Sequence, residues 1–313
     1  MSYHQAPRGI DLRRSVLMGL TLLPLLAAVG MAACGKGKET GEAAAGTVAR
    51  PRVAVSVAPQ AELVERLARG AVEVVTMIPA GSDVETYSPS PQQMAAFATA
   101  RIFFEVGHPA LPLEGAYLGP WLARHPEVRR VSLAAHVERR RGLGGGAGPG
   151  DDDPHLWMSV RAMRGAAAEL AVALAELLPG EAPTLAARAD ALDAELARLD
   201  AELADRFRAA AGRRFLVYHP ALGYLAHDYG LVQEAIEAEG KEPSPARLAA
   251  LIESARRAGV RAVLGQRGMP PKSAEILAAA LGARVIEIDP MAADWLANLR
   301  RIAAAVEVAL VDG

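Results

Sequence analysis

From residue 51 onward, short apolar runs alternate with amphipathic stretches, and this alternation restricts the fold more than any other feature of the chain. Runs such as residues 53–57 and 102–106 predict buried strands, and the stretches between them have the spacing of helices. Ser90 before Pro91, with Gln93 three residues after the serine, predicts the start of one of these helices through a capping box. Strands that alternate with helices form βαβ units around largely parallel sheets. We therefore expect an α/β fold.

A long helical stretch divides this alternating pattern into two halves. Residues 184–211 carry one apolar stripe, and at 1.5 Å per residue the helix would be about 42 Å long. We expect two Rossmann-like α/β lobes with parallel sheets, over residues 51–182 and 213–313. A long rigid helix over residues 183–212 would join them.

The N-terminal segment has the layout of an export signal. Arg8, Arg13 and Arg14 precede an apolar run at residues 16–26, and small residues then lead to Cys34. This order is typical of a signal peptide, and the apolar run is shorter than a membrane span. The text Met-Ala-Ala-Cys also resembles a bacterial lipobox, whose cysteine is lipidated and becomes the mature N-terminus.

The prediction for this segment is an exported, membrane-anchored protein in the periplasm or at the cell surface. Residues 1–33 would be the signal peptide, Cys34 the lipidated residue, and residues 34–50 a flexible tether of Gly, Ala, Lys, Glu and Thr. The alternative is ordinary secretion with a cysteine there by chance.

Charge and cysteine content exclude several function classes. The formal net charge is −2, from 34 basic and 36 acidic residues. The chain therefore lacks the excess of basic residues that is typical of a nucleic-acid-binding protein. Because Cys34 is the only cysteine, the chain can form neither an internal disulfide nor a cysteine-rich zinc site.

Metal-capable side chains fall where predicted strands end. In the second half, His219 directly follows a predicted strand and Asp289 ends another. In the first half, Glu85 lies in the loop after a predicted strand and His155 follows the loop after another. Ligands of open α/β sheets bind beyond the carboxyl ends of the strands. The four side chains can therefore meet in a cleft between the lobes. Each also has a structural alternative as a capping, loop or strand-end residue, and His108 competes with Glu85.

Two imidazoles and two carboxylates suit a divalent ion such as Zn²⁺, Mn²⁺ or Fe²⁺. Four protein ligands would close a tetrahedral shell and leave no position for a reacting water, which favours carrying the ion over using it in catalysis. We find no nucleophile-elbow, zinc-protease or phosphate-loop motif and expect no enzymatic activity.

Several segments resemble the zinc- and manganese-binding family of ABC-transporter solute-binding lipoproteins. The resemblance covers roughly residues 53 to 310 and is carried by PAGSDVETYSPSPQQM (79–94), DPHLWMSV (153–160), HPALGYLAHDYGL (219–231), EGKEPSP (239–245) and IDPMAADW (288–295). It implies two α/β lobes joined by a long helix, with the ion between them.

The resemblance also implies a ligand set. His155 matches the histidine of the Asp-Pro-His motif, His219 a position that is His or Glu, and Asp289 the carboxylate before a proline. Glu85 departs from the pattern, because many members have His there. The loop before His155 lacks the histidines of many zinc-specific members. We favour zinc, with manganese or iron as the alternative.

Together these observations predict a monomeric lipoprotein that captures a divalent transition-metal ion and delivers it to an ABC-type permease with its ATPase. Two alternatives remain open: a metal-dependent extracytoplasmic hydrolase, and a surface adhesion lipoprotein of the kind that some relatives are named for. An open coordination site with turnover would favour the first. Surface binding that survives loss of the ligands would favour the second.

Overall fold

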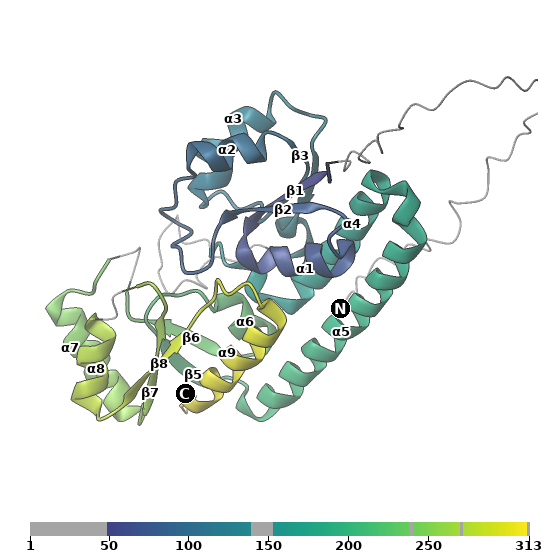
Figure 1. Cartoon of the computed structure of the whole chain (residues 1–313). Helices are drawn as coiled ribbons and strands as arrows, with labels where there is room; N and C mark the ends of the chain where they lie inside the picture. Colours follow the sequence, from purple (N-terminus) through teal and green to yellow (C-terminus); the bar gives the residue numbers. More distant parts are fainter. Residues whose placement is uncertain (1–48, 139–152, 238–240, 270–271, 312–313) are drawn as a thin grey trace, which may run out of the picture. The chain divides into compact units, whose positions relative to one another are not determined.

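The computed structural model describes residues 49–138, 153–237, 241–269 and 272–311, which belong to one compact unit. The predicted signal peptide, Cys34, nearly all of the tether and most of the glycine- and aspartate-rich loop before His155 (residues 142–153) lie outside the described residues. Within the described part, two parallel four-stranded sheets carry flanking helices (Figure 1), so the expected α/β fold with two lobes is confirmed.

The first sheet has the strand order β2-β1-β3-β4, and all its strand pairs are parallel. Its elements are β1 (Arg52–Val57), α1 (Ala58–Ala68), β2 (Glu73–Ile78), α2 (Pro91–Phe97), β3 (Ala100–Glu105), a π-helical turn (Leu113–Leu118), α3 (Gly119–Leu122) and β4 (Arg129–Ser132). The predicted capping box is present: the Ser90 hydroxyl accepts from the Gln93 amide, and the Gln93 side chain accepts from the Ser90 amide.

The second sheet repeats this arrangement with the order β6-β5-β7-β8, again parallel. Its elements are β5 (Arg214–Val217), α6 (Gly223–Asp228), β6 (Val232–Ala235), α7 (Pro245–Arg257), β7 (Ala262–Gln266), α8 (Lys272–Leu281), β8 (Arg284–Ile288) and α9 (Trp295–Ala309). The sequence pattern does not predict β6, because this short edge strand has two polar residues among four and only its last residue is buried.

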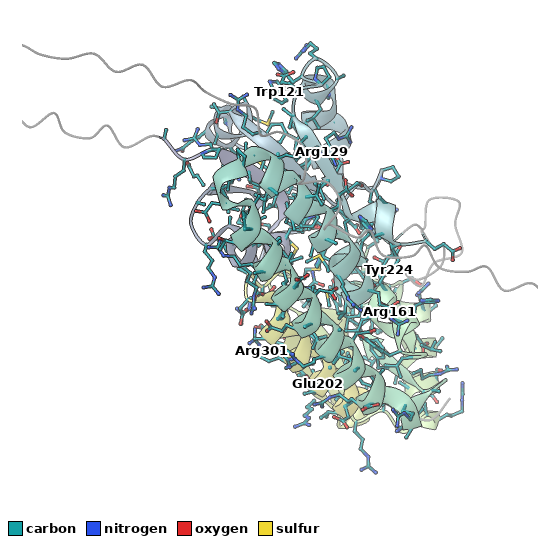
Figure 2. All side chains as sticks on the ribbon, turned by 90° about the vertical axis from the view of Figure 1, so that its right-hand side faces the viewer. Trp121, Arg129, Arg161, Glu202, Tyr224 and Arg301 are labelled. Atoms are coloured by element: carbon teal, nitrogen blue, oxygen red, sulfur yellow. The ribbon has the colours of Figure 1, made fainter. Side chains whose placement is uncertain are left out.

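Two long helices, α4 (Val160–Leu177) and α5 (Ala182–Phe207), connect the two sheets in the chain. The apolar stripe of α5 is buried as expected, and the helix contacts α1, α4 and α9 (Figure 1). Figure 2 looks onto α5, with Arg161 beside it and Glu202 toward its lower end. Arg161 of α4 pairs with Asp200 of α5, and Glu202 pairs with Arg300 of α9. The joining helix is therefore tied to both lobes.

The core continues from one sheet to the other. One cluster of buried side chains includes residues of both sheets and of α4, α5 and α9, whereas a smaller second cluster lies under α7 and α8. Two buried tryptophans link the halves: the Trp157 indole donates to the Pro290 carbonyl at 2.9 Å, and the Trp295 indole donates to the Trp157 carbonyl at 2.9 Å. These bonds fix the two segments that lead into the predicted site.

Among the described residues, no single helix is long and apolar enough to cross a membrane. The pair Val160–Leu177 and Pro179–Ala210 passes the same test of length and composition only as a pair, and it is bent by 118°.

Candidate metal centre

Three of the four predicted ligands come together at the strand ends. Glu85, His155 and His219 each offer one ligand atom, and these atoms all lie within 4.8 Å of one another. Glu85 lies in the loop after β2, His155 directly before a 3₁₀ turn at Leu156–Met158, and His219 two residues after β5. The two histidines are 2% exposed, while the Glu85 side chain is 35% exposed.

Asp153 fixes the orientation of His155. Its Oδ1 accepts from the His155 backbone amide at 2.8 Å and lies 2.7 Å from the His155 Nδ1. A carboxylate only accepts hydrogen bonds, so Nδ1 carries the hydrogen and the lone pair of the neutral ring is on Nε2. The edge of the ring meets Trp157, with the ring centroids 5.2 Å apart. The Nε2 lone pair of His155 is therefore the one available to a metal ion, beside the buried Trp157 ring.

Glu237 fixes the orientation of His219 in the same way. Its Oε1 lies 2.6 Å from the His219 Nδ1, and the glutamate itself is 5% exposed. Burial lowers the pKa of His219, but the hydrogen bond and charge of Glu237, with the charges of Glu85 and Asp83, outweigh it, so the pKa is raised. Negative charge around this imidazole favours any cation that binds to it.

The two Nε2 atoms face each other at 3.3 Å. With both Nδ1 hydrogens directed at carboxylates, two neutral rings would place lone pair against lone pair, which a shared cation resolves. Two nitrogens bound to one tetrahedral Zn²⁺ at about 2.05 Å lie about 3.3 Å apart. The imidazole pair therefore has the spacing that a tetrahedral metal ion requires.

Glu85 is less closely placed than the imidazoles. Its Oε1 lies 4.0 Å from the His219 Nε2, about 0.7 Å more than two ligands of a tetrahedral Zn²⁺. Asp83 holds the backbone of this loop, since its carboxylate accepts from the Glu85 amide at 2.9 Å and from the Thr86 hydroxyl at 2.8 Å. The half-buried glutamate can close the remaining gap by turning its side chain.

Asp289 lies outside this group of three. Its Oδ1 accepts from the Met291 amide at 3.0 Å, and its Oδ2 lies 3.7 Å from the Arg267 Nη1. His108, the competing candidate, also lies outside: its Nδ1 accepts from the Ala110 amide at 3.2 Å. That bond places the hydrogen of a neutral His108 ring on Nε2, so neither ring nitrogen offers a lone pair to a metal ion in this geometry.

The sequence reasoning did not assign roles to Asp153 and Glu237. Asp153 stands two residues before His155, a spacing at which an aspartate side chain can bond the following backbone and ring, and this signal was readable. Glu237 is 18 residues from its histidine and follows the unpredicted strand β6, so only the pairing of β5 with β6 brings it to His219. Carboxylates that orient ligating histidines normally matter almost as much as the ligands.

Known proteins share this architecture. The family model described as zinc-uptake complex component A, periplasmic, matches residues 53–309. A crystal structure of ZnuA is 34% identical, with a TM-score of 0.75 over 83% of this chain and 98% of that chain. A zinc-bound ZnuA deletion mutant is also 34% identical, with a TM-score of 0.74 over 83% and 97%.

A curated relative agrees with these structures. A putative metal-binding protein of Treponema pallidum is 27% identical over 248 residues, which are 74% of this chain and 76% of that protein. The family model covers most of the chain, and the resemblance drawn from the motifs is confirmed. The chain belongs to the family of the zinc-uptake complex component A, the periplasmic metal-binding components of ABC importers.

Proposed function

We propose that this protein captures Zn²⁺ outside the cytoplasm through Glu85, His155 and His219, with Asp289 as the fourth ligand, and delivers it to an ABC permease. The observation that carries the proposal is the pair of buried imidazoles, whose Nε2 atoms lie 3.3 Å apart while carboxylates hold both Nδ1 atoms. Zinc is favoured over manganese and iron because two imidazoles and a tetrahedral spacing suit it best. The zinc-bound ZnuA structure is consistent with this choice.

The site supports carrying an ion rather than catalysis. Both histidines and Trp157 beside them are buried, and Asp289 would complete a closed shell as the proposed fourth ligand. A closed shell of protein ligands leaves no position for a reacting water.

The test is native mass spectrometry with elemental analysis on the mature protein, purified without added metal and then exposed to Zn²⁺, Mn²⁺ or Fe²⁺. We expect one metal ion per chain, with Zn²⁺ held most tightly. His155→Ala and His219→Ala should each lose it. His125→Ala is the matched control, because His125 stacks on Trp121 and pairs with Glu127 away from the group. Full metal loading in both ligand variants would refute the proposal.

We further propose that the protein is a monomer anchored to the membrane through a lipid on Cys34. Cys34→Ser should release it into the soluble fraction or leave the precursor unprocessed. A mature-sized product of this variant that stays in the membrane fraction would refute the anchor without affecting the metal site.

A further inference from the structure

Arg267 occupies the position beside the one predicted ligand that lies outside the group of three. It follows β7, and its backbone amide donates to the Ile288 carbonyl at 2.9 Å. Its Nε donates to the Glu287 Oε1 at 3.0 Å, and its Nη1 lies 3.7 Å from the Asp289 Oδ2. The guanidinium thus spans two carboxylates at the end of β8.

Of the oxygens of Asp289, only the carboxylate Oδ2 accepts no hydrogen bond from the described residues that holds the local backbone. Oδ1 accepts from the Met291 amide, and the backbone carbonyl accepts from the Asn298 side chain at 2.7 Å. These bonds hold the backbone and one carboxylate oxygen. Oδ2 has Arg267 as its charged neighbour, and the side chain is 14% exposed. A rotation of the carboxylate can redirect Oδ2 while the bond from Asn298 to the Asp289 backbone carbonyl remains.

The loop that carries Arg267 is held against the loop that carries Glu85. Gly268 has a φ of +82°, and a Cβ there would lie 2.7 Å from the Gly81 carbonyl oxygen. Only glycine fits so close to that carbonyl in this backbone conformation. Arg267 therefore belongs to a loop that is in close contact with the loop of Glu85.

We propose that Arg267 is a positioning residue that holds the Asp289 Oδ2 out of the metal site, and that the incoming divalent ion displaces it. This inference rests on the proposed function. Two cations compete for one oxygen: an exposed guanidinium at 3.7 Å, and a metal ion that bonds a carboxylate oxygen at about 2.0–2.2 Å. An exposed pair of this kind is weak, so the metal ion prevails.

Glu287 gives Arg267 a second acidic partner besides Asp289. Since the 3.0 Å bond to Glu287 does not involve Asp289, the guanidinium keeps this partner when Oδ2 leaves. It is then ready to take Oδ2 back, which lowers the affinity for the ion and speeds its release. The cost in affinity should be modest, about two- to fivefold, as expected for an exposed ion pair.

The experiment is a double-mutant cycle with Zn²⁺ as the probe, measured by competition with a chromophoric chelator. Arg267→Gln should raise the affinity about two- to fivefold and slow chelator-induced release by a similar factor. In the Asp289→Asn background the same change should have no effect. Arg267→Lys keeps the charge and should stay close to wild type. Arg284→Gln, at the other end of β8, removes the same charge far from Asp289 and should change nothing.

Three outcomes would overturn the inference: unchanged affinity and release in Arg267→Gln, an equal gain in the Asp289→Asn background, or a wild-type affinity in Asp289→Asn itself. If Asp289→Asn binds too weakly for the cycle, the release rates of the Gln, Lys and Arg284 variants decide. A wild-type protein that binds no metal would refute the proposed function as well. Binding that depends on the two histidines but not on Arg267 would refute only this inference.

Discussion

Replacing Glu237 tests whether the geometry around His219 controls metal affinity. Glu237→Gln keeps an oxygen that can accept from Nδ1 but removes the charge, and Glu237→Ala removes both. In the alanine variant the Nδ1 hydrogen loses its partner, and the ring can shift its hydrogen to Nε2, where it would block the metal ion.

The expected magnitude follows from the 2.6 Å contact and its burial. Loss of a partner that orients a ligating histidine lowers metal affinity about 10- to 100-fold, or roughly 1.4–2.7 kcal/mol. We expect Glu237→Gln near the lower end and Glu237→Ala near the upper end, because only the alanine variant loses both the bond and the charge.

The assay is isothermal titration of Zn²⁺ with a competing chelator, on variants whose circular dichroism matches wild type. Glu234→Gln is the matched control, since Glu234 lies on β6 three residues earlier and pairs with Arg214 at 3.7 Å. Wild-type affinity in both Glu237 variants, or an equal loss in Glu234→Gln, would refute the reasoning.

Three further predictions concern stability. Zn²⁺ at a thousand times its dissociation constant should stabilise the fold by about 4 kcal/mol and raise the Tm, and a chelator should reverse this; identical melting curves would contradict a metal carrier. Gly165→Ala should lower the free energy of unfolding by about 1–3 kcal/mol in urea, because the new Cβ would lie 2.8 Å from the His136 Nδ1. Adding His136→Gly should recover part of the loss, and a gain in stability from Gly165→Ala alone would contradict this contact. Burial raises the pKa of Glu114 to about 7, although the hydrogen bond from Ser56 opposes the shift. Between about pH 4.5 and 7 the folded state therefore keeps a proton on Glu114 that the unfolded state loses. The free energy of unfolding should fall by up to about 3 kcal/mol as the pH rises through this range. Urea unfolding at several pH values should show a smaller fall in Glu114→Gln than in wild type, and parallel profiles would exclude this role.

The sequence by itself determined the two α/β lobes, the joining helix and the places where metal-capable residues stand. Apolar periodicity and the capping box at Ser90 are local signals: the helix after Ser90 begins at the expected residue, and α5 begins two residues before and ends four residues before the expected bounds of 184–211. The edge strand β6 could not be predicted, because it is short, has two polar residues among four and carries no such periodic signal.

Only the tertiary structure decided which of these residues meet and how they are oriented. Glu85, His155 and His219 are far apart in the chain, and the tie of Trp157 to Pro290 lies between segments 133 residues apart. A carboxylate sets the orientation of each imidazole. For His219 this carboxylate is Glu237, which follows the neighbouring strand β6. Periodicity records which face of an element is buried, whereas the distance between two side chains depends on how separate elements pack against each other.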